Sequence, residues 1–262
     1  MSTNTIKTFL CESFSDYISW SLDLCSKHHF VIFRGVKSDL FPLIPGIART
    51  VKSKWNRTKS IQVNEIENQM FEEFLTINNR EIKAMDIKEK DQLEVLCLAQ
   101  HYGLPTRLLD WTSNPLAALW FACDAISDKD DLNTNISIWA CCMKENDRRI
   151  IDPRNQMEVR EKPFDVNRTY IFKPLNVTDR IHLQAGWFTL HDRDPRQGFV
   201  PLEKNNEYRP DLCRVLIKKE LVENLLDKLD ILHVNSSVLF PGISGACNHL
   251  RYKVLSRYKE FE

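Results

Sequence analysis

Apolar residues recur along much of the chain at the three-to-four-residue spacing of a helix that buries one side. This spacing predicts helices over residues 13–27, 63–80 and 219–229, a helix that ends at Gly103, and a basic helix that starts near Ser244. Gly103 is followed closely by Pro105, which is a typical way for a helix to end.

Shorter apolar runs bounded by turn-forming residues predict the strands. They cover residues 30–33, 106–111, 136–143, 213–217 and 231–234. Helices and strands follow one another without the regular alternation of a doubly wound parallel sheet. The sequence therefore predicts an α+β fold, with mixed or antiparallel sheets and flanking helices.

A further strand is predicted over residues 179–191, where apolar and polar residues alternate around Gly186. Arg180, His182 and Gln184 would share one face of this strand, because side chains two residues apart point to the same side. Three polar side chains on one face can line a cleft. A sheet surface that faces solvent would show the same pattern, so both interpretations stay open.

The segment from residue 100 to residue 123 combines a helix end, a turn, a short strand and the start of a second helix. Ser113 or Asn114 can cap the second helix, and Pro115 suits its first turn. The first N–H groups of that helix would then face outward, beside the polar side chains of the turn. Such N–H groups commonly hold a phosphate or another anion.

Polar residues around this helix start are the first candidates for a site. They are Arg107, Asp110, Thr112 and Ser113. One interpretation is an anion site that uses Arg107 directly. The other is a structural ion pair between Arg107 and Asp110 that braces the turn, because buried ion pairs are common outside catalytic sites.

A second candidate follows the first strand. Arg34 stands at the strand's exit, and Gly35 would let the backbone approach a ligand, so the pair is a plausible anion contact. A surface arginine beside a turn glycine is the alternative. Residues 39–50 form an irregular loop in which Arg49 either reaches a ligand or is simply solvated. The basic run around Trp55, over residues 52–59, is typical of nucleic-acid contacts or of an exposed face.

Charge and composition limit the classes of partner. Lys plus Arg and Asp plus Glu both number 36, so the formal net charge is zero. Proteins that hold nucleic acid through their overall field usually carry a basic excess. The chain has no run of about 18 apolar residues, and its first residues lack the pattern of a secretory signal. We therefore expect a cytoplasmic protein without membrane contact.

The eight cysteines contain no C-x-x-C pair and lie mostly in apolar runs, so free buried thiols are expected. Cys97 and His101 are four residues apart on a predicted helix and could share a metal ion. No second pair is spaced to complete a tetrahedral site, so no metal is expected.

Several motifs together resemble the FRG domain, a family named after a Phe-Arg-Gly tripeptide. They are Phe33-Arg34-Gly35, the block from Gln100 to Pro115, Arg180-Ile181 followed by Gln184-x-Gly186-x-Phe188, and Leu239-Phe240-Pro241. The resemblance runs over residues 30–251. It implies a single FRG domain over residues 1–262, with an N-terminal helical segment at residues 1–29.

FRG domains occur in bacteria and phages, often in settings of conflict between the two. Their motif order also resembles that of the ADP-ribosyltransferase superfamily, with its split sheet. The resemblance therefore implies a toxin or anti-phage effector that binds NAD or another nucleotide. Such a protein would either modify a macromolecular target, protein or nucleic acid, or hydrolyse NAD.

Carried over residue by residue, the resemblance gives roles to particular side chains. Arg34 would contact the NAD diphosphate or the nicotinamide ribose, and Gln184 would fall in the third motif. A transferase has a Glu there, whose negative charge stabilises the positively charged transition state. Gln184 carries no charge, so Asp110 is the first choice for the carboxylate, with Asp179 and Glu220 as weaker ones.

The expected site is then defined in two sets. The expected catalytic residues are Arg34, Asp110 and Gln184. The expected cofactor-binding residues are Arg34, Gly35, His101, Arg107, Thr112 and Ser113. The alternative function is a non-catalytic module that senses a nucleotide, a nucleic acid or a phage protein, and Gln184 in place of Glu fits it.

Overall fold

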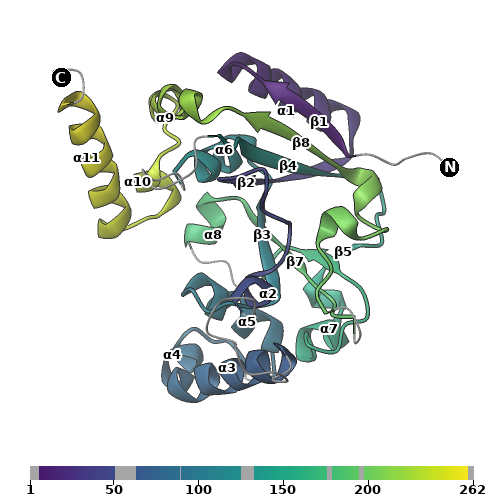
Figure 1. Ribbon diagram of the computed structural model, residues 1–262. Coiled ribbons are helices and arrows are strands. Elements are labelled where there is room, and N and C mark those ends of the chain that lie inside the picture. The colour runs from purple at the N-terminus through teal and green to yellow at the C-terminus, as the bar shows by residue number, and fades with distance from the viewer. Residues whose placement is uncertain are drawn as a thin grey trace.

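A computed structural model of the chain describes residues 6–50, 63–88, 90–124, 133–175, 179–194 and 198–258. Its centre is an eight-stranded mixed sheet with eleven α-helices around it (Figure 1). In sheet order the strands are β1 (Lys7–Cys11), β8 (Leu212–Ile217), β4 (Ile136–Met143), β2 (Phe30–Val36), β3 (Leu108–Thr112), β7 (Gly186–Leu190), β6 (Tyr170–Phe172) and β5 (Ile150–Ile151).

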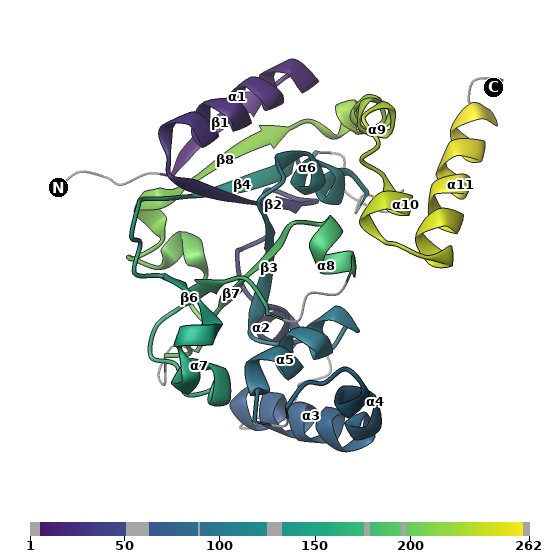
Figure 2. The ribbon, with the colours of Figure 1, turned by 180° about the vertical axis from the view of Figure 1, so that it is seen from behind.

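The sheet consists of two halves that meet at one point. β1, β8, β4 and β2 form the first half-sheet, and β3, β7, β6 and β5 form the second. Neighbouring strands are antiparallel except for β1 with β8 and β5 with β6. Between the halves, β2 and β3 pair only at Phe33 and Thr112 along their described lengths. β3 then turns away from β2, as the view from behind shows (Figure 2).

Three helices cover one face of the first half-sheet. They are α1 (Phe14–Lys27), α6 (Pro115–Asp124) and α9 (Val222–Ile231). Their apolar side chains share one core with β2, β4 and β8. The Ser13 hydroxyl caps α1 by accepting a hydrogen bond from the Asp16 N–H. The shared core holds α6 against the first half-sheet, and α6 begins shortly after β3, next to the point where the sheet divides.

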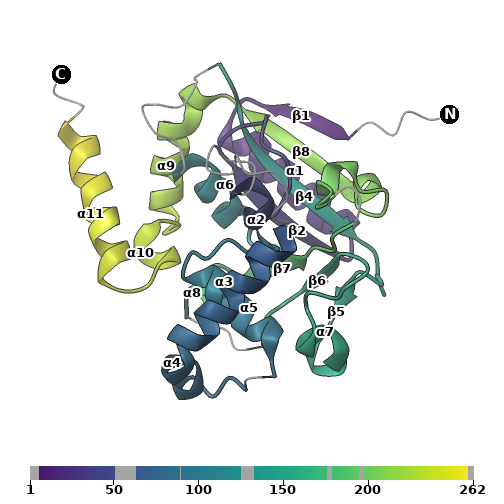
Figure 3. The same ribbon diagram turned by 60° about the horizontal axis from the view of Figure 1, so that its bottom comes forward.

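Helices on the second half-sheet form a separate core. α3 (Val63–Ile77), α4 (Asn79–Ala84), α5 (Gln92–His101) and α7 (Met157–Glu161) contribute to it (Figure 3). The remaining helices are α2 (Gly46–Thr50), α8 (Asp179–Leu183), α10 (Ser236–Leu239) and α11 (Ile243–Tyr258). α2 and α5 lie near the start of β3, at the end of the strand away from its pairing with β2 (Figure 1).

Most of the predicted elements are confirmed. Helix 13–27 is α1, helix 219–229 is α9 with a preceding turn, and the helix ending at Gly103 is α5. The predicted helix over residues 63–80 is instead two helices, α3 and α4, that meet at Asn78. The mixed sheet with flanking helices confirms the general fold class.

The strand predicted over residues 179–191 is wrong. Its first part is helix α8, and the strand β7 begins only at Gly186. Between them Ala185 adopts a left-handed backbone, with a φ of 48°, which interrupts any strand. Arg180, His182 and Gln184 therefore do not share a strand face.

The strand predicted over residues 231–234 is also wrong. Ile231 is the last residue of α9, and His233 turns the chain with a φ of 58°. The Val234 N–H then donates to the Leu229 carbonyl at 2.8 Å, which closes the end of the helix. The apolar residues of this stretch form a helix end.

Two further expectations concern membranes and cysteines. No helix in the described residues is long and apolar enough to cross a bilayer. All eight cysteines are free thiols; six are buried, and Cys25 and Cys247 are exposed. The basic run over residues 52–59 lies outside the described residues.

Candidate functional site

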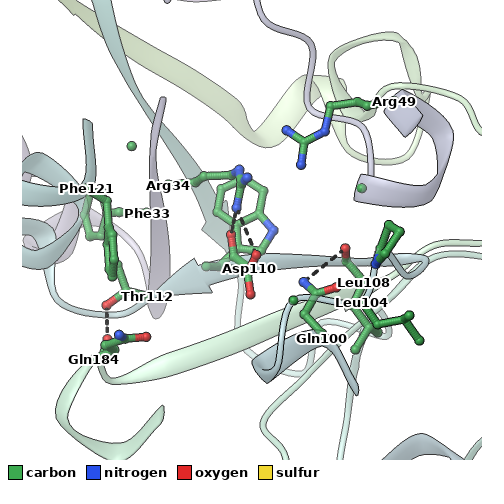
Figure 4. Close-up of a pocket in the computed structure, with 15 residues that line it drawn as sticks. Phe33, Arg34, Arg49, Gln100, Leu104, Leu108, Asp110, Thr112, Phe121 and Gln184 are labelled. Carbon is green, nitrogen blue, oxygen red and sulfur yellow. Dashed lines mark hydrogen bonds and ion pairs between the residues drawn. The ribbon is translucent and has the colours of Figure 1, made fainter. Parts of the chain in front are cut away.

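A cleft opens where β2 and β3 diverge (Figure 4). Its volume is about 540 Å³, and small-molecule sites typically span about 300–1,000 Å³. Both half-sheets, helix α2, helix α6 and the turn before β3 contribute to its wall. The cleft therefore lies at the junction that the central sequence block was expected to form.

Arg34 reaches from β2 to β3 along the wall of this cleft. Its Nη1 donates a hydrogen bond to the backbone carbonyl of Asp110 at 2.5 Å and lies 3.6 Å from the Asp110 carboxylate. The Arg34 side chain is only 15% exposed. Burial lowers the pKa of the guanidinium from its ordinary value, and nearby Asp110 opposes that effect. Because an arginine keeps its proton in proteins, Arg34 is a fixed positive charge in the wall.

Arg49, near the end of α2, lies across the cleft from Arg34 (Figure 4). Its side chain is exposed, and no carboxylate pairs with it within the described part of the chain. Its positive charge contributes to the lowered pKa of Arg34. Two guanidinium groups that face one space repel each other, and an anion between them relieves the repulsion. The pair is therefore suited to hold a phosphate or diphosphate.

Asp110 is the one carboxylate among the residues that line the cavity. Its side chain is 60% exposed and lies in the middle of β3. Two arginines and one aspartate leave the lining with a formal charge of +1. The cleft thus favours an anionic ligand and keeps one negative group available beside it.

The turn before β3 is held by hydrogen bonds among three residues. The Thr106 hydroxyl donates to the Gln100 side-chain oxygen and accepts from the Leu108 N–H, the latter at 3.0 Å. Gln100 Nε2 in turn donates to the Leu108 carbonyl at 3.4 Å. Gln100, which also lines the cavity, therefore fixes the start of β3 and with it the position of Asp110.

Thr112 lines the cavity, but its hydroxyl is already engaged. It donates to the Gln184 carbonyl at 2.6 Å and accepts from the Asn114 N–H at 2.9 Å. The Ser113 hydroxyl and N–H both point to the Ala185 carbonyl, and Ser113 is not part of the lining. Both hydroxyls therefore tie β3 to the chain after α8. Ser113 lies outside the lining of the cleft, whereas a ligand contact of Thr112 stays a prediction.

The start of α6 is capped from within the protein. Asn114 Oδ1 accepts from the N–H groups of Leu116 and Ala117, at 3.0 and 3.4 Å. The sequence left Ser113 and Asn114 open as caps, and Asn114 is the one used. Because the cap occupies these N–H groups, the expected anion site at the start of this helix is not formed by them.

Gln184 lies between the cleft and the C-terminal part of the chain. Its Nε2 donates to the Leu239 carbonyl at 2.9 Å, and its side chain lines the cavity. An amide held through its nitrogen leaves the side-chain oxygen as an acceptor. Gln184 can thus accept a hydrogen bond from a ligand hydroxyl, but it supplies no charge.

Arg107 does not belong to this cleft. Its guanidinium forms a two-pronged ion pair with Glu67, with a shortest distance of 2.7 Å, and both side chains are 2% exposed. It also donates to the Phe164 carbonyl at 3.0 Å and lies over the ring of Phe164. The expected ligand contact is therefore corrected, and so is the expected partner, because the ion pair forms with Glu67 and not with Asp110.

Gly35 and His101 lie at the wall and at the edge of the site. A Cβ at Gly35 would lie 1.9 Å from the Ala118 carbonyl oxygen, so the glycine allows α6 to pack directly on β2. The position of a side chain therefore faces α6, while Gly35 itself lines the cleft; its contact with a ligand stays a prediction. His101 ends α5 and lines a smaller adjoining cavity, which shares Asp110 and Gln184 with the main cleft. It stays a candidate contact at the edge of the site.

His191 lies buried close to this region. Its Nε2 is 3.1 Å from the Thr189 hydroxyl, which accepts from the Trp111 indole N–H. Burial, with smaller contributions from the charges of Arg34 and Arg107, lowers the pKa of His191 from 6.5 to about 3. The imidazole is therefore neutral in the folded protein at any pH near neutral.

This lowered pKa predicts a loss of stability in acid. Below pH 6.5 the unfolded chain binds a proton at His191 that the folded protein binds only near pH 3. Stability therefore falls as the pH falls through that window, by about 2 kcal/mol between pH 7 and pH 5. Urea unfolding of the native chain and of His191→Gln at both pH values measures the difference. If the variant lost as much stability as the native chain, His191 would not be its source.

The fold and the site define a mixed α/β domain with a positively lined cleft between two half-sheets. A scan against protein-family models matches residues 29–131 to the FRG domain, so the chain carries an FRG domain over that range. Searches of curated proteins and of solved structures found no match.

The matched range accounts for most of the cleft. It contains β2, α2, α5, β3 and α6, and with them Arg34, Arg49 and Asp110. Gln184 and the strands that complete the second half-sheet lie beyond it. The expected extension of the domain to residue 251 therefore stays a prediction.

Two contacts, one in the cleft and one outside it, were not predicted from the sequence. Phe121 of α6 lines the cavity and packs against the core of the first half-sheet. Glu67 is the partner of Arg107, and a glutamate on a charged helix reads as solvated. No local signal distinguishes either residue; both follow from contacts between distant segments.

Proposed function

We propose that the cleft binds a nucleotide through its phosphates, with NAD as the leading ligand. The observation that carries this proposal is the pair Arg34 and Arg49, which face each other across one cavity. A diphosphate between them would receive charge-assisted hydrogen bonds from both sides. The FRG domain resemblance to ADP-ribosyltransferases agrees with this choice of ligand.

The rest of the lining suits the other parts of such a ligand. Phe33 and Phe121 line one side of the cleft as an apolar wall, and Leu104 lies on the other side (Figure 4). An aromatic or apolar wall beside a few polar groups is the usual composition of a small-molecule site. A base or nicotinamide ring would pack on this wall, while Gln184 would accept a hydrogen bond from a ribose hydroxyl.

We further propose that Asp110 supports cleavage of NAD. In this reaction the bond between the nicotinamide nitrogen and the ribose carbon breaks, and nicotinamide leaves with the electron pair. Water or a target nucleophile then bonds to the ribose carbon and loses a proton. The carboxylate of Asp110 would stabilise the positive charge that develops on the ribose. The sheet divided into two halves supports comparison with the split sheet of the transferases.

A binding module without catalysis is the second candidate. The observation that favours it is the contact between Arg34 and the Asp110 carboxylate at 3.6 Å. A carboxylate paired with a guanidinium in the resting site stabilises a neighbouring cation less than a free one does. In this case the cleft would hold the nucleotide, and binding would be the signal.

Calorimetric titration of the purified chain with NAD, ADP-ribose and ADP tests ligand binding. We expect Arg49→Gln to weaken the binding of each, because a hydrogen bond to a charged group contributes about 1.5–3 kcal/mol, or roughly 10- to 150-fold in Kd. Arg154→Gln is the matched control, since Arg154 is an exposed arginine paired with Asp152 and outside the cleft. Equal affinity in native chain and Arg49→Gln would remove the proposed phosphate site.

Release of nicotinamide from NAD tests cleavage separately. We expect Asp110→Asn to retain NAD binding and to release nicotinamide roughly 100- to 1,000-fold more slowly, the effect of losing one electrostatic stabiliser. Arg34→Ala should also lose activity, with a melting temperature close to that of the native chain. Tight binding without nicotinamide release in the native chain would establish the binding module instead.

A further inference from the structure

A second cavity lies between helices α6, α9, α10 and α11, on the side of the molecule that carries the C-terminus (Figure 1). Its volume is about 770 Å³, within the range of about 300–1,000 Å³ that small-molecule sites span. Phe240 separates it from the cleft. The Phe240 ring lies 6.0 Å from the ring of Phe121, which lines the cleft, and 5.8 Å from that of Trp120, which lines the second cavity. In the described part of the chain the two spaces share no lining residue.

The wall of this cavity is partly apolar and is held in place. Its apolar members are Trp120, Val222, Leu226, Phe240 and Leu255. Two of its hydroxyls are engaged within the protein: Ser236 donates to the Gly245 carbonyl at 3.1 Å, and Tyr252 donates to the Asp227 carboxylate at 2.6 Å. These bonds fix α11 against α10 and α9. The space is therefore suited to an apolar ligand body that packs beside aromatic rings.

The charges of the lining are balanced, unlike those of the cleft. Lys219 and Arg251 contribute two cations, and Asp124 and Glu223 contribute two carboxylates, so the formal charge is zero. Lys219 is only 6% exposed and donates to the Thr134 hydroxyl at 2.7 Å. A lining of this kind gives no net attraction to an anion such as a phosphate. It favours a ligand that carries both signs of charge.

Asp124 and Arg251 are the two groups available to such a ligand. Neither has a hydrogen bond or an ion pair within the part of the chain that the structure describes, although both line the same cavity. They lie on different helices, Asp124 on α6 and Arg251 on α11. The protein around the Asp124 carboxyl removes part of its water and raises its pKa, and no cation among the described residues counteracts this rise. A ligand cation beside Asp124 would supply the missing opposite charge.

We propose that this cavity binds a small zwitterion with an apolar body, which is the chemistry of a free amino acid or a short peptide. The ligand's ammonium group would lie beside Asp124, and its carboxylate would accept charge-assisted hydrogen bonds from Arg251. Its apolar body would pack on Trp120 and Phe240. This proposal does not depend on the ligand of the cleft.

Calorimetric titration of the full chain with matched probes tests the proposal. The probes are the dipeptide leucyl-phenylalanine, its N-acetyl form without the ammonium group, its C-terminal amide without the carboxylate, and free phenylalanine. We expect the dipeptide to bind about tenfold or more tightly than either blocked form, because each blocked form loses one charged partner. Tighter binding of free phenylalanine than of the dipeptide would identify an amino acid as the ligand, and the reverse order would identify a peptide. Equal binding of the dipeptide and its blocked forms would overturn the proposal, as would no binding of either the dipeptide or phenylalanine.

Variants of the chain locate the site. Asp124→Asn should remove the difference between the dipeptide and its N-acetyl form, while Arg251→Gln should remove the difference between the dipeptide and its amide. Each variant should keep the other preference. Arg154→Gln is the matched control, because Arg154 is an exposed arginine outside this cavity. Circular dichroism verifies that each variant is folded. If both variants kept the two native preferences, the dipeptide would bind elsewhere and the proposal would be wrong.

Discussion

Replacing Arg107 with methionine is expected to destabilise the protein strongly, although it changes none of the residues that line the cleft. The substitution keeps much of the apolar volume but removes the charge that pairs with Glu67. The carboxylate of Glu67 is 2% exposed, and its remaining hydrogen bond comes from the backbone N–H of residue 107. Breaking a buried pair in this way typically costs about 3–5 kcal/mol, because one buried charge is left uncompensated.

Urea unfolding and thermal melting measure this effect. For a chain of this size, that loss of free energy corresponds to a fall in melting temperature of roughly 10 °C. The double variant Glu67→Gln with Arg107→Met should be more stable than Arg107→Met alone, because it removes the unpaired charge. Arg154→Met removes an exposed pair and should leave the unfolding midpoint unchanged. If Arg107→Met instead kept its stability and lost nucleotide binding, the sequence-based assignment of Arg107 to the ligand would be correct.

Arg107 also shows where prediction from the sequence ends. The block from residue 100 to residue 115 located the turn, the strand β3 and the start of α6, because those features depend on neighbouring residues. The partner of Arg107 depends instead on how α3 packs, and Glu67 lies 40 residues away in the chain. Local patterns do not specify which charges meet across such a distance.

The same contrast explains the elements that were predicted wrongly. Polar and apolar residues alternate over residues 179–183, a pattern that a helix as short as α8 can also show. The break after it depends on the left-handed backbone at Ala185, a conformation that non-glycine residues adopt only where surrounding contacts enforce it. Here the Ser113 N–H donates to the Ala185 carbonyl at 3.0 Å, so the enforcing contact comes from the central block.

Within the site, the residues at strand positions were the predictable ones. Arg34 was selected as an arginine at the exit of a strand and Asp110 as a charged residue of the central block, and the structure brings them into contact. Arg49 was left open between a ligand contact and a solvated side chain, and the structure places it on the cleft. Thr112 and Ser113 carry hydroxyls of the kind that bind ligands, but these hydroxyls donate hydrogen bonds to backbone carbonyls nearby.

Replacing Gly35 with alanine is expected to lower the stability of the fold by a similarly large amount. Ligand binding would be lost only as a consequence of that instability. The added Cβ would lie 1.9 Å from the Ala118 carbonyl oxygen and 2.7 Å from the Ala122 backbone nitrogen. Both are backbone atoms of α6, so no side-chain rotation relieves the contact. The helix must move off β2, and overpacking of this kind costs about 3 kcal/mol or more.

A second glycine of the cleft provides the control for this expectation. Gly46 lines the same cavity, but a Cβ there would meet its nearest neighbour, Pro105, at an ordinary 3.6 Å. Gly46→Ala should therefore melt close to the native chain, while Gly35→Ala melts far below it or fails to fold. A Gly35→Ala protein that stayed stable and lost only nucleotide affinity would show that the glycine serves ligand approach. The expected outcome gives two residues of the Phe-Arg-Gly motif different roles. Arg34 faces the cleft, and Gly35 allows α6 to pack against the sheet that forms the cleft.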